Sequence, residues 1–374
     1  MESCDLIIVG GGPAGSSLAW KLKDLGLDVL IMDKSSFPRD KVCAGWVTPS
    51  VFKTLQIDPA EYGKNRELQP ITGFRTGMIG RSEILTEYGK TVSYGIRRSE
   101  FDHYLLERSG ARLRLGEPVK TIFRQDSHWI INESFKAPIV IGAGGHFCPV
   151  SRLINPDNGN NNVSAVIAKE IEFEMDEREQ RECRVRPDIP ELYFCDDLKG
   201  YGWCFRKGKY LNIGLGRQDK EGVSRHVESF SRLLMRQGKV SHIPAKFKGH
   251  AYMLYPPASR NLLEDGVMLI GDAAGLAHPK SGEGIRPAIE SGLMAADVIV
   301  AAGGNYNKDK LRPYTELLKK RLGGFNAGNA LDMFPEYLKK QISRKAMTSK
   351  FFSRHILLDR WFLNSHQAPL SGSS

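Results

Sequence analysis

The amino-terminal stretch constrains the fold of this chain more than any other part of the sequence. A short apolar run ending at Val9 is followed at once by glycines at positions 10, 12 and 15 and by a helix-favouring segment that extends to Leu25. This order predicts a strand, a tight turn and a helix whose amino terminus faces a pyrophosphate. Gly10 allows the sharp turn, Gly12 lets the phosphates approach the backbone, and Gly15 lets the helix lie close to the strand.

The next apolar run ends in an acidic residue. Residues 27–32 are followed by Asp33, eighteen positions after Gly15. A carboxylate near this distance is placed to bind the hydroxyl pair of a ribose. A glycine turn without a ligand is the alternative interpretation, but the acidic strand end argues against it. The sequence therefore predicts a dinucleotide-binding domain at the amino terminus.

Length and composition fit a globular protein with two connected cores. The chain has 374 residues, 41% of them apolar and 26% charged. No apolar run approaches the ~18 residues that span a bilayer, and no basic segment precedes the amino-terminal run as in a cleavable signal. The six cysteines are scattered, without C-x-x-C pairs or zinc-ligand spacing. We therefore expect a cytoplasmic, reduced protein without a metal site.

Positive charge is concentrated at the carboxyl end. The net charge is +10, and residues 301–374 hold thirteen Lys and Arg against five Asp and Glu, a surplus of eight. Basic helices there favour peripheral contact with the anionic inner face of a membrane, or with an acidic partner. A solvated face that keeps the protein soluble explains the charge equally well. No nucleic-acid motif accompanies the charge, so nucleic acid is not an expected partner; the oligomeric state stays open.

The order of the predicted elements indicates two interleaved domains and a helical carboxyl end. A Rossmann-type domain is expected from residues 1–60, 96–158 and 261–304. An antiparallel-sheet substrate domain is expected from residues 61–95 and 159–260. Basic helices are expected over residues 305–374, with breaks near Gly323-Gly324 and Pro335. The predicted fold class is therefore α/β combined with α+β.

Two further stretches return to the first domain. A buried strand over residues 266–270 delivers Asp272 just past its end, where open α/β sheets bind ligands. A glycine-containing loop then leads into a helix predicted over residues 285–302. Earlier in the chain, Ser99 is predicted to cap the amino terminus of a helix that contains Phe101.

These separated motifs occur together and in order, and the chain resembles the flavoprotein family of geranylgeranyl reductases, within the p-hydroxybenzoate-hydroxylase-like class. The matches include the glycine fingerprint, the start R-x-x-F-D at residues 98–102, the loop K-x-C-x-G at residues 41–45, and a nearly complete flavin motif over residues 271–292. They cover roughly residues 1–300. Two positions depart from the pattern: Asp33 stands where glutamate is more common, and Gly144 replaces an aspartate.

The resemblance implies that FAD is the cofactor and that NAD(P)H or another external donor reduces it. The positions that it assigns to FAD are Gly10, Gly12, Pro13, Ala14, Gly15, Asp33, Lys34, Lys41, Cys43, Ala44, Gly45, Arg98, Gly271, Asp272, Pro279, Gly282, Gly284 and Ile285.

A strand with alternating aromatic residues is the candidate substrate-binding element. Tyr201, Trp203 and Phe205 are predicted to point to one face. The stretch resembles the substrate motif P-x-x-Y-x-W-x-F-P of the geranylgeranyl reductases, with Leu198 and Arg206 in place of the prolines. It also resembles the motif G-W-x-W-x-I-P of flavin-dependent halogenases. The face either walls a pocket for an apolar chain or belongs to the domain core.

Cys43 is our candidate proton donor, because a thiol can lie beside flavin at little desolvation cost and can give up a proton. A packing role for this small side chain is the alternative. Tyr201 and Trp203 are the other candidate catalytic residues. His278 and Glu283 lie in the flavin loop and are candidate acids or bases, although packing and hydrogen-bonding roles are more common for such residues.

Three hypotheses for the function follow. The first is FAD-dependent reduction of carbon–carbon double bonds in an isoprenoid or another apolar substrate. The second is an oxygen-using FAD monooxygenase, hydroxylase-like or halogenase-like, that acts on an aromatic substrate, including one carried on a partner protein. The third is a flavin-binding partner protein without turnover.

Overall fold

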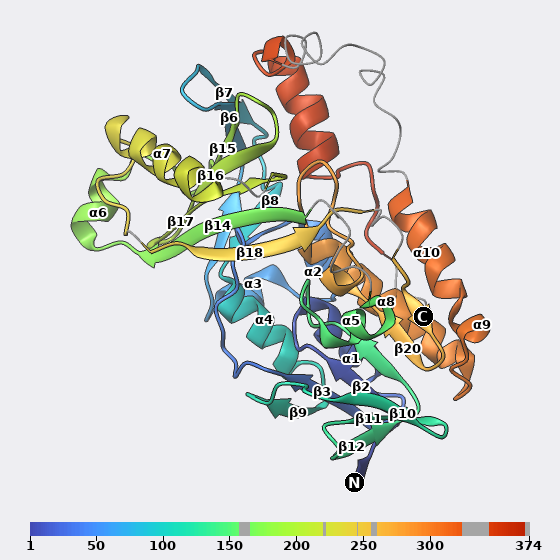
Figure 1. Ribbon diagram of the computed structural model, residues 1–374. Helices are drawn as coiled ribbons and strands as arrows, with labels where there is room; N and C mark the ends of the chain where they lie inside the picture. Colours follow the sequence, from blue (N-terminus) through green and yellow to red (C-terminus); the bar gives the residue numbers. More distant parts are fainter. Residues whose placement is uncertain (157–164, 220–221, 245, 256–259, 324–343, 371–374) are drawn as a thin grey trace.

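The computed structural model describes residues 1–156, 165–219, 222–244, 246–255, 260–323 and 344–370. Figure 1 shows a parallel sheet with α1 and α8 in the lower half, and a large, mainly antiparallel sheet with α7 in the upper half. The predicted combination of α/β and α+β architecture is confirmed.

The lower half is built on a six-stranded sheet. Its strands, in spatial order, are β19 (Leu263–Glu264), β20 (Val267–Leu269), β13 (Val140–Gly142), β2 (Leu6–Val9), β3 (Val29–Asp33) and β9 (Arg112–Leu115). Neighbouring strands are parallel except for β19 and β20. Strands β2, β3, β13 and β20 consist largely of buried apolar residues, as parallel strands covered on both faces require.

Helices α1 (Pro13–Leu22) and α8 (Ile285–Ala302) pack together beside this sheet. The contact depends on Gly292, because a Cβ there would lie 2.4 Å from the carbonyl oxygen of Ala14. The predicted helix over residues 285–302 is confirmed. A smaller sheet adjoins these elements and contains β1 (Glu2–Ser3), β12 (Phe135–Ala137), β11 (His128–Ile131) and β10 (Ile122–Gln125). Helix α5 (Pro149–Ile154) follows β13.

The predicted cap of α4 (Arg98–Glu107) is wrong. The helix begins at Arg98, with Arg97 as the N-cap, so Ser99 lies inside the first turn. Arg98 forms two 2.8 Å hydrogen bonds with the carboxylate of Asp102, one turn further along. This i,i+4 pair favours a helix that already includes Arg98.

The upper half is built on a seven-stranded sheet. Its strands, in order, are β18 (Lys248–Met253), β14 (Ala165–Glu174), β17 (Tyr210–Arg217), β16 (Gly200–Lys207), β15 (Glu191–Phe194), β6 (Gly73–Met78) and β7 (Glu83–Glu87). All neighbours are antiparallel except β15 and β6. Helix α7 (Val223–Arg236) packs its apolar face against β17, and α6 (Glu177–Glu182) follows β14.

The strands of a three-stranded sheet are interleaved in the sequence with β6 and β7 of the upper sheet. This three-stranded sheet consists of β4 (Trp46–Val47), β8 (Ser93–Ile96) and β5 (Leu68–Ile71), with the short helices α2 (Pro49–Thr54) and α3 (Pro59–Gly63) nearby. Two of these strands flank the loop at residues 34–45 and helix α4, so this sheet helps to position the loop relative to Arg98.

The carboxyl-terminal part is helical where it is described. It contains α9 (Lys308–Leu311), α10 (Pro313–Leu322) and the helical segment η5 (Phe352–Phe362), and the single turn η2 (Gly271–Ala273) precedes α8. Gly324 and Pro335, two of the predicted break points, lie outside the described residues. Within the described part of the chain, no helix combines the length and apolar character needed to cross a membrane.

Candidate active site

The amino-terminal glycine turn has the geometry that a dinucleotide requires. Gly10 has a φ of +120°, and a Cβ on Gly15 would lie 2.1 Å from the carbonyl oxygen of Gly10. Helix α1 starts directly after Gly12, and no side chain caps its amino terminus. An uncapped helix amino terminus beside a glycine turn is a ready site for phosphate oxygens.

Asp33 ends β3 beside this turn, as predicted. Its Oδ2 accepts a hydrogen bond from the backbone N–H of Gly11 at 2.9 Å, and its Oδ1 accepts one from Ser35. Arg39 approaches the same turn, since its Nη2 lies 3.5 Å from the position of a Cβ on Gly12. Among the described residues, Lys34 makes no hydrogen bond or ion pair.

Residues from three predicted motifs meet His250 in a half-buried charged cluster. Lys41 Nζ lies 2.9 Å from Nε2 of His250. This histidine nitrogen lies 3.6 Å from Oδ2 of Asp272. Although burial raises the pKa of Asp272, His250 and Lys41 bring it below its usual value. Arg98 pairs with Asp102 in the same region. Its positive charge helps to lower the pKa of Lys41 and the pKa of Asp272.

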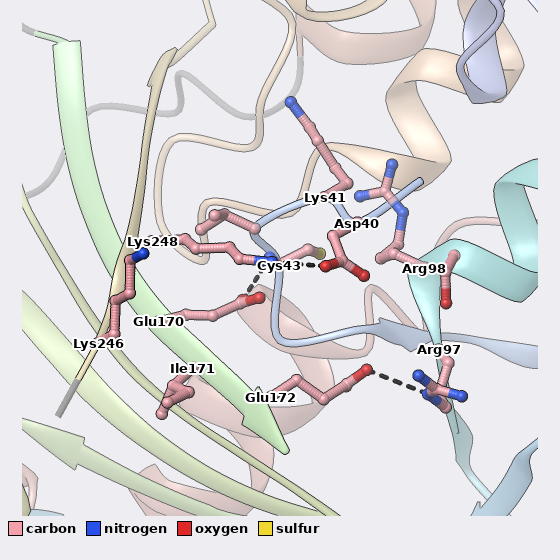
Figure 2. A pocket seen from close by; sticks show the side chains of 12 residues that line it. Asp40, Lys41, Cys43, Arg97, Arg98, Glu170, Ile171, Glu172, Lys246 and Lys248 are labelled. Atoms are coloured by element: carbon pink, nitrogen blue, oxygen red, sulfur yellow. Dashed lines mark hydrogen bonds and ion pairs between the residues drawn. The ribbon is translucent and has the colours of Figure 1, made fainter. Parts of the chain in front are cut away.

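The Cys43 backbone is held at its N–H and at its carbonyl oxygen by the upper sheet. Its N–H donates to the carboxylate of Glu170 on β14 (Figure 2). Its carbonyl oxygen accepts from Nδ2 of Asn212 on β17 at 3.1 Å. Asn212 also accepts a 2.7 Å hydrogen bond from the indole N–H of Trp203. One amide thereby links the cysteine loop to the aromatic strand.

The remainder of the cysteine loop is fitted closely to the same sheet. Gly45 has a φ of +65°, and a Cβ there would lie 2.3 Å from Nζ of Lys207. The Gly45 N–H donates to Sγ of Cys43 at 3.4 Å. Lys207 is almost fully buried and donates to Glu172 at 2.6 Å.

Two glutamates on β14, the buried Glu170 and the half-buried Glu172, have pKa values shifted in opposite directions. Burial raises the pKa of Glu170 to about 8. Burial also raises the pKa of Glu172, but Lys207 and Asn212 outweigh it and leave the value below normal. Glu172 is therefore the ionised partner of Lys207, whereas Glu170 is a carboxyl group that holds its proton at neutral pH.

The aromatic face predicted on β16 is confirmed. Tyr201, Trp203 and Phe205 share one apolar cluster, whereas Cys204, between them, belongs to the cluster on the opposite face of the sheet. Segment η5 covers the first cluster: Phe362 stacks on Trp46 with centroids 5.5 Å apart and meets Tyr201 edge-on at 5.5 Å.

The loop of residues 277–284 joins this face to the lower sheet. The Tyr201 hydroxyl donates to the carbonyl oxygen of Ser281, and a Cβ on Gly282 would lie 2.4 Å from the hydroxyl of Tyr252. Gly284 lies beside Asp272, and Ile285 is buried. Tyr201 and the loop that contains Pro279, Gly282 and Gly284 are thus brought together.

Two titratable residues of this loop have different roles. Burial lowers the pKa of His278 to about 4, and its Nδ1 accepts hydrogen bonds from the backbone N–H groups of Lys280 and Ser281. His278 therefore shapes the loop as a neutral imidazole. Burial raises the pKa of Glu283 to about 7, and neither of its carboxylate oxygens has a hydrogen-bond partner within the described ranges. An orphaned buried carboxyl in this loop fits a site built for an additional polar group.

Sequence reasoning missed Arg39, Glu170, Asn212 and His250. The acidic alternation of Glu170, Glu172 and Glu174 was one available signal, because alternate residues of a strand share a face. His250 and Asn212 had no local signal, since only the pairing of β14 with β17 and β18 brings them to the cysteine loop.

Sequence comparisons identify relatives along most of the chain. Residues 8–47 match the family described as an NAD(P)-binding Rossmann-like domain. A menaquinone reductase of Mycobacterium tuberculosis is 27% identical, over 90% of this chain and 86% of the relative. Digeranylgeranylglycerophospholipid reductase 2 of Methanothermobacter thermautotrophicus is 28% identical, over 85% of this chain and 84% of the relative.

Solved structures share the fold. A geranylgeranyl bacteriochlorophyll reductase-like protein of Thermoplasma acidophilum has a TM-score of 0.71 at 22% identity, over 93% of this chain and 88% of that protein. The flavin-dependent brominase Bmp2 has a TM-score of 0.67 at 18% identity, over 94% and 92% of the two chains. The named relatives confirm the resemblance to the geranylgeranyl reductases, and the chain is an FAD-dependent oxidoreductase.

Proposed function

We propose that this chain reduces carbon–carbon double bonds of an isoprenoid or a similarly apolar substrate, with Cys43 as the proton donor. The observation that carries the proposal is the position of the Cys43 peptide. It is fixed between the charged cluster of Asp272 and Arg98 and the strand that holds Trp203. One short loop therefore connects the proposed cofactor site with the proposed substrate face.

The cofactor site uses the parts of the fold predicted to bind FAD. The uncapped amino terminus of α1 would face the pyrophosphate and Asp33 the ribose, and Asp272 and the loop before α8 would hold the flavin end. We propose residues 1–60, 96–158 and 261–304 as this domain, and NAD(P)H or another external compound as the donor. Reduced flavin supplies a hydride when it is bound.

Cys43 is placed to give up a proton. Sγ already accepts the Gly45 N–H at 3.4 Å, and the Arg98 guanidinium interacts with the same thiol. Both groups stabilise the negative charge that develops on sulfur as the proton leaves. In the balanced reaction one carbon of the double bond receives the hydride and the other receives the Cys43 proton, while the π bond and the S–H bond break.

The aromatic face is suited to an apolar substrate. Tyr201 is half-buried, and Trp203 and Phe205 are buried in the same apolar cluster, which η5 covers. We propose residues 61–95 and 159–260 as the substrate domain. The relatives named as reductases of menaquinone and of digeranylgeranylglycerophospholipid support a reductase rather than an oxygenase.

The competing function is an oxygen-using monooxygenase of an aromatic substrate, which the fold shared with a brominase favours. The deciding experiment reduces the purified flavoprotein without oxygen and mixes it separately with oxygen and with a prenyl-chain lipid. Lipid-dependent flavin oxidation, with a saturated product by mass spectrometry, is the expected result. A long-lived flavin–oxygen adduct without lipid reduction would establish the monooxygenase instead, and no substrate-stimulated oxidation would indicate a protein without turnover.

Cys43→Ala tests the proton donor. Turnover should fall by about 10²–10⁴-fold, the range typical of general acids, while an artificial donor reduces the flavin at the normal rate. Cys183→Ala is the matched control, because Cys183 is also a half-buried free cysteine but lies after α6, in the cluster behind the sheet. Equal turnover in the Cys43 and Cys183 variants would assign Cys43 a packing role.

We also propose that residues 305–374 contact an anionic membrane surface. Phe351 is 69% exposed at the start of η5, and the neighbouring exposed residues include Lys345, Lys350 and His355. An exposed aromatic ring among basic side chains is typical of a segment that lies in the interface of a membrane.

A further inference from the structure

A small cavity opens beside the cysteine loop and does not overlap the aromatic face of β16 (Figure 2). Its volume is about 70 Å³. An ordered water needs about 10–15 Å³ of cavity volume of this kind, so the cavity has room for more than one water. The side chains that Figure 2 draws around it come from the cysteine loop, the start of α4, β14, and β18 with the residues before it.

The cavity runs from the surface to the cysteine loop. Asp40 and Lys248 pair with each other at its outer edge, where both side chains are more than 60% exposed. Glu170 lies deeper, at 6% exposure, and Cys43 lines the same space. Since Glu170 accepts the Cys43 N–H, its carboxyl group is fixed next to the residue proposed to lose a proton.

Glu170 is the member of this group suited to carry a proton. Burial raises its pKa to about 8, so that it is protonated at neutral pH and still able to ionise. The charged or titratable groups that face it from the surrounding elements are Glu172 on β14, Lys207 on β16, Lys248 on β18, Arg98 on α4, and Lys41 and Cys43 in the loop. Lys207 is paired with Glu172 instead, and within the described ranges Glu170 forms no ion pair.

We propose that Glu170 is a relay residue that returns a proton to Cys43 from water in this cavity after each reduction. The inference rests on the proposed function, because it requires that Cys43 is the proton donor. In the relay the O–H bond of Glu170 breaks as the S–H bond of Cys43 forms, and the Glu170 carboxylate then takes a proton from a cavity water that exchanges with solvent. No electrons are transferred.

The first test measures protonation in the holoenzyme without substrate. Infrared difference spectra across about pH 6 to pH 9.5 should show, beside the loss of a Glu283 band near pH 7, a carboxylic-acid C=O band that disappears with a midpoint near pH 8. Glu170→Gln should abolish this band, whereas Cys43→Ala should keep it. Glu174→Gln, at an exposed position on the same strand, should also keep it. A spectrum unchanged by Glu170→Gln would overturn the proposal.

The second test measures the thiol. Above about pH 8 the Glu170 carboxylate repels negative charge on the Cys43 sulfur, so Glu170→Gln should speed alkylation of Cys43 by about tenfold. Peptide mass spectrometry separates Cys43 from the other cysteines. Identical alkylation profiles in the wild type and Glu170→Gln would show that the two groups do not interact and would refute the relay.

Turnover distinguishes the relay from the proposed function. With a prenyl lipid, turnover by the wild type should fall as the pH rises through about 8, because Glu170 loses its proton there. Glu170→Gln should lower turnover more than tenfold and remove this dependence on pH. Glu170→Asp should restore part of the turnover and part of the pH dependence. If Cys43→Ala is fully active, the proposed function fails at Cys43 and the relay fails with it. If Cys43→Ala is slow and Glu170→Gln is as fast as the wild type, the relay alone is wrong. Should Glu170→Gln not fold, Glu170→Asp must move the infrared midpoint, and an unmoved midpoint would refute the proposal.

Discussion

At the scale of single residues, the site depends on a few polar side chains that each satisfy two neighbours. Asn212 is the clearest case, because one amide contacts the Cys43 carbonyl, the Trp203 indole and the Glu172 carboxylate. Buried polar groups left without partners cost about 1–3 kcal/mol each. The cysteine loop is therefore held by directional bonds in addition to packing.

Asn212→Ala should destabilise the protein by about 2–4 kcal/mol, since it leaves the Trp203 N–H and the Cys43 carbonyl unpaired. Urea unfolding measured by tryptophan fluorescence gives the change. Asn305→Ala, at an exposed position, is the control and should change the free energy of unfolding by less than about 0.5 kcal/mol. Equal stabilities for the two variants would contradict the role assigned to Asn212.

Asp272→Ala should release FAD. The carboxylate is half-buried just past the end of β20 and is the anionic member of the cluster with His250 and Lys41. Its loss leaves two basic groups without their counter-charge in the proposed flavin site. The absorbance ratio of flavin to protein after gel filtration measures occupancy, and Asp309→Ala on α9 is the surface control. A variant that retains full FAD would refute the assignment of Asp272.

Glu170 makes the stability of the protein depend on pH. Its folded pKa of about 8 lies above the ordinary glutamate pKa of 4.5 expected for the unfolded chain. The folded state therefore binds more protons between these values, and stability falls as pH rises through this window. Glu170→Gln should remove this contribution, so the wild type should lose stability relative to the variant from about pH 5 to about pH 8. Thermal melts across this range test the sign, and a constant difference between the two proteins would contradict it.

At the scale of elements, the sequence predicted the strands, turns and helices that local residue patterns determine. The turn before α1, the strand that ends at Asp33 and the helix over residues 285–302 each have their own signal in glycine positions and periodicity. The parallel pairing of β15 with β6 has none, because more than a hundred residues separate the two strands. For the same reason His250 could not be assigned to Asp272 before the register of β14 and β18 was known.

Gly15→Ala tests the closest contact between the first strand and helix. The added Cβ would lie 2.1 Å from the Gly10 carbonyl oxygen and 2.9 Å from Ile8, so the turn must move away from the helix. We expect a loss of about 1–3 kcal/mol, typical of overpacking, together with reduced FAD retention. Gly249→Ala on β18 is the control, because a Cβ there meets no atom within 4 Å. Normal flavin occupancy and stability in Gly15→Ala would refute the tight turn.

At the scale of the whole molecule, segments from the two ends of the chain meet over the upper sheet. Trp46, from the strand after the cysteine loop, stacks on Phe362 of η5, and Phe194 meets the same ring edge-on. The sequence predicted helices at the carboxyl end but not this contact, because aromatic residues in a basic segment do not specify which surface they cover. The segment that closes the proposed substrate face is therefore also the one that exposes Phe351.

Because η5 covers the aromatic face and also begins beside the exposed Phe351, we can predict how a lipid substrate reaches the site. If η5 lies on a membrane while it covers the aromatic face, an apolar substrate can pass from lipid to the site without crossing water. Phe351→Ala should lower binding to vesicles with anionic lipid by about tenfold, because burial of a phenylalanine ring contributes about 1.5–3 kcal/mol. It should slow turnover of vesicle-borne lipid while leaving turnover of a detergent-dispersed substrate unchanged. Phe147→Ala, which removes another exposed phenylalanine on the turn before α5, is the control. If Phe351→Ala binds vesicles as well as the wild type, or if neutral vesicles bind equally well, the basic segment serves solubility alone.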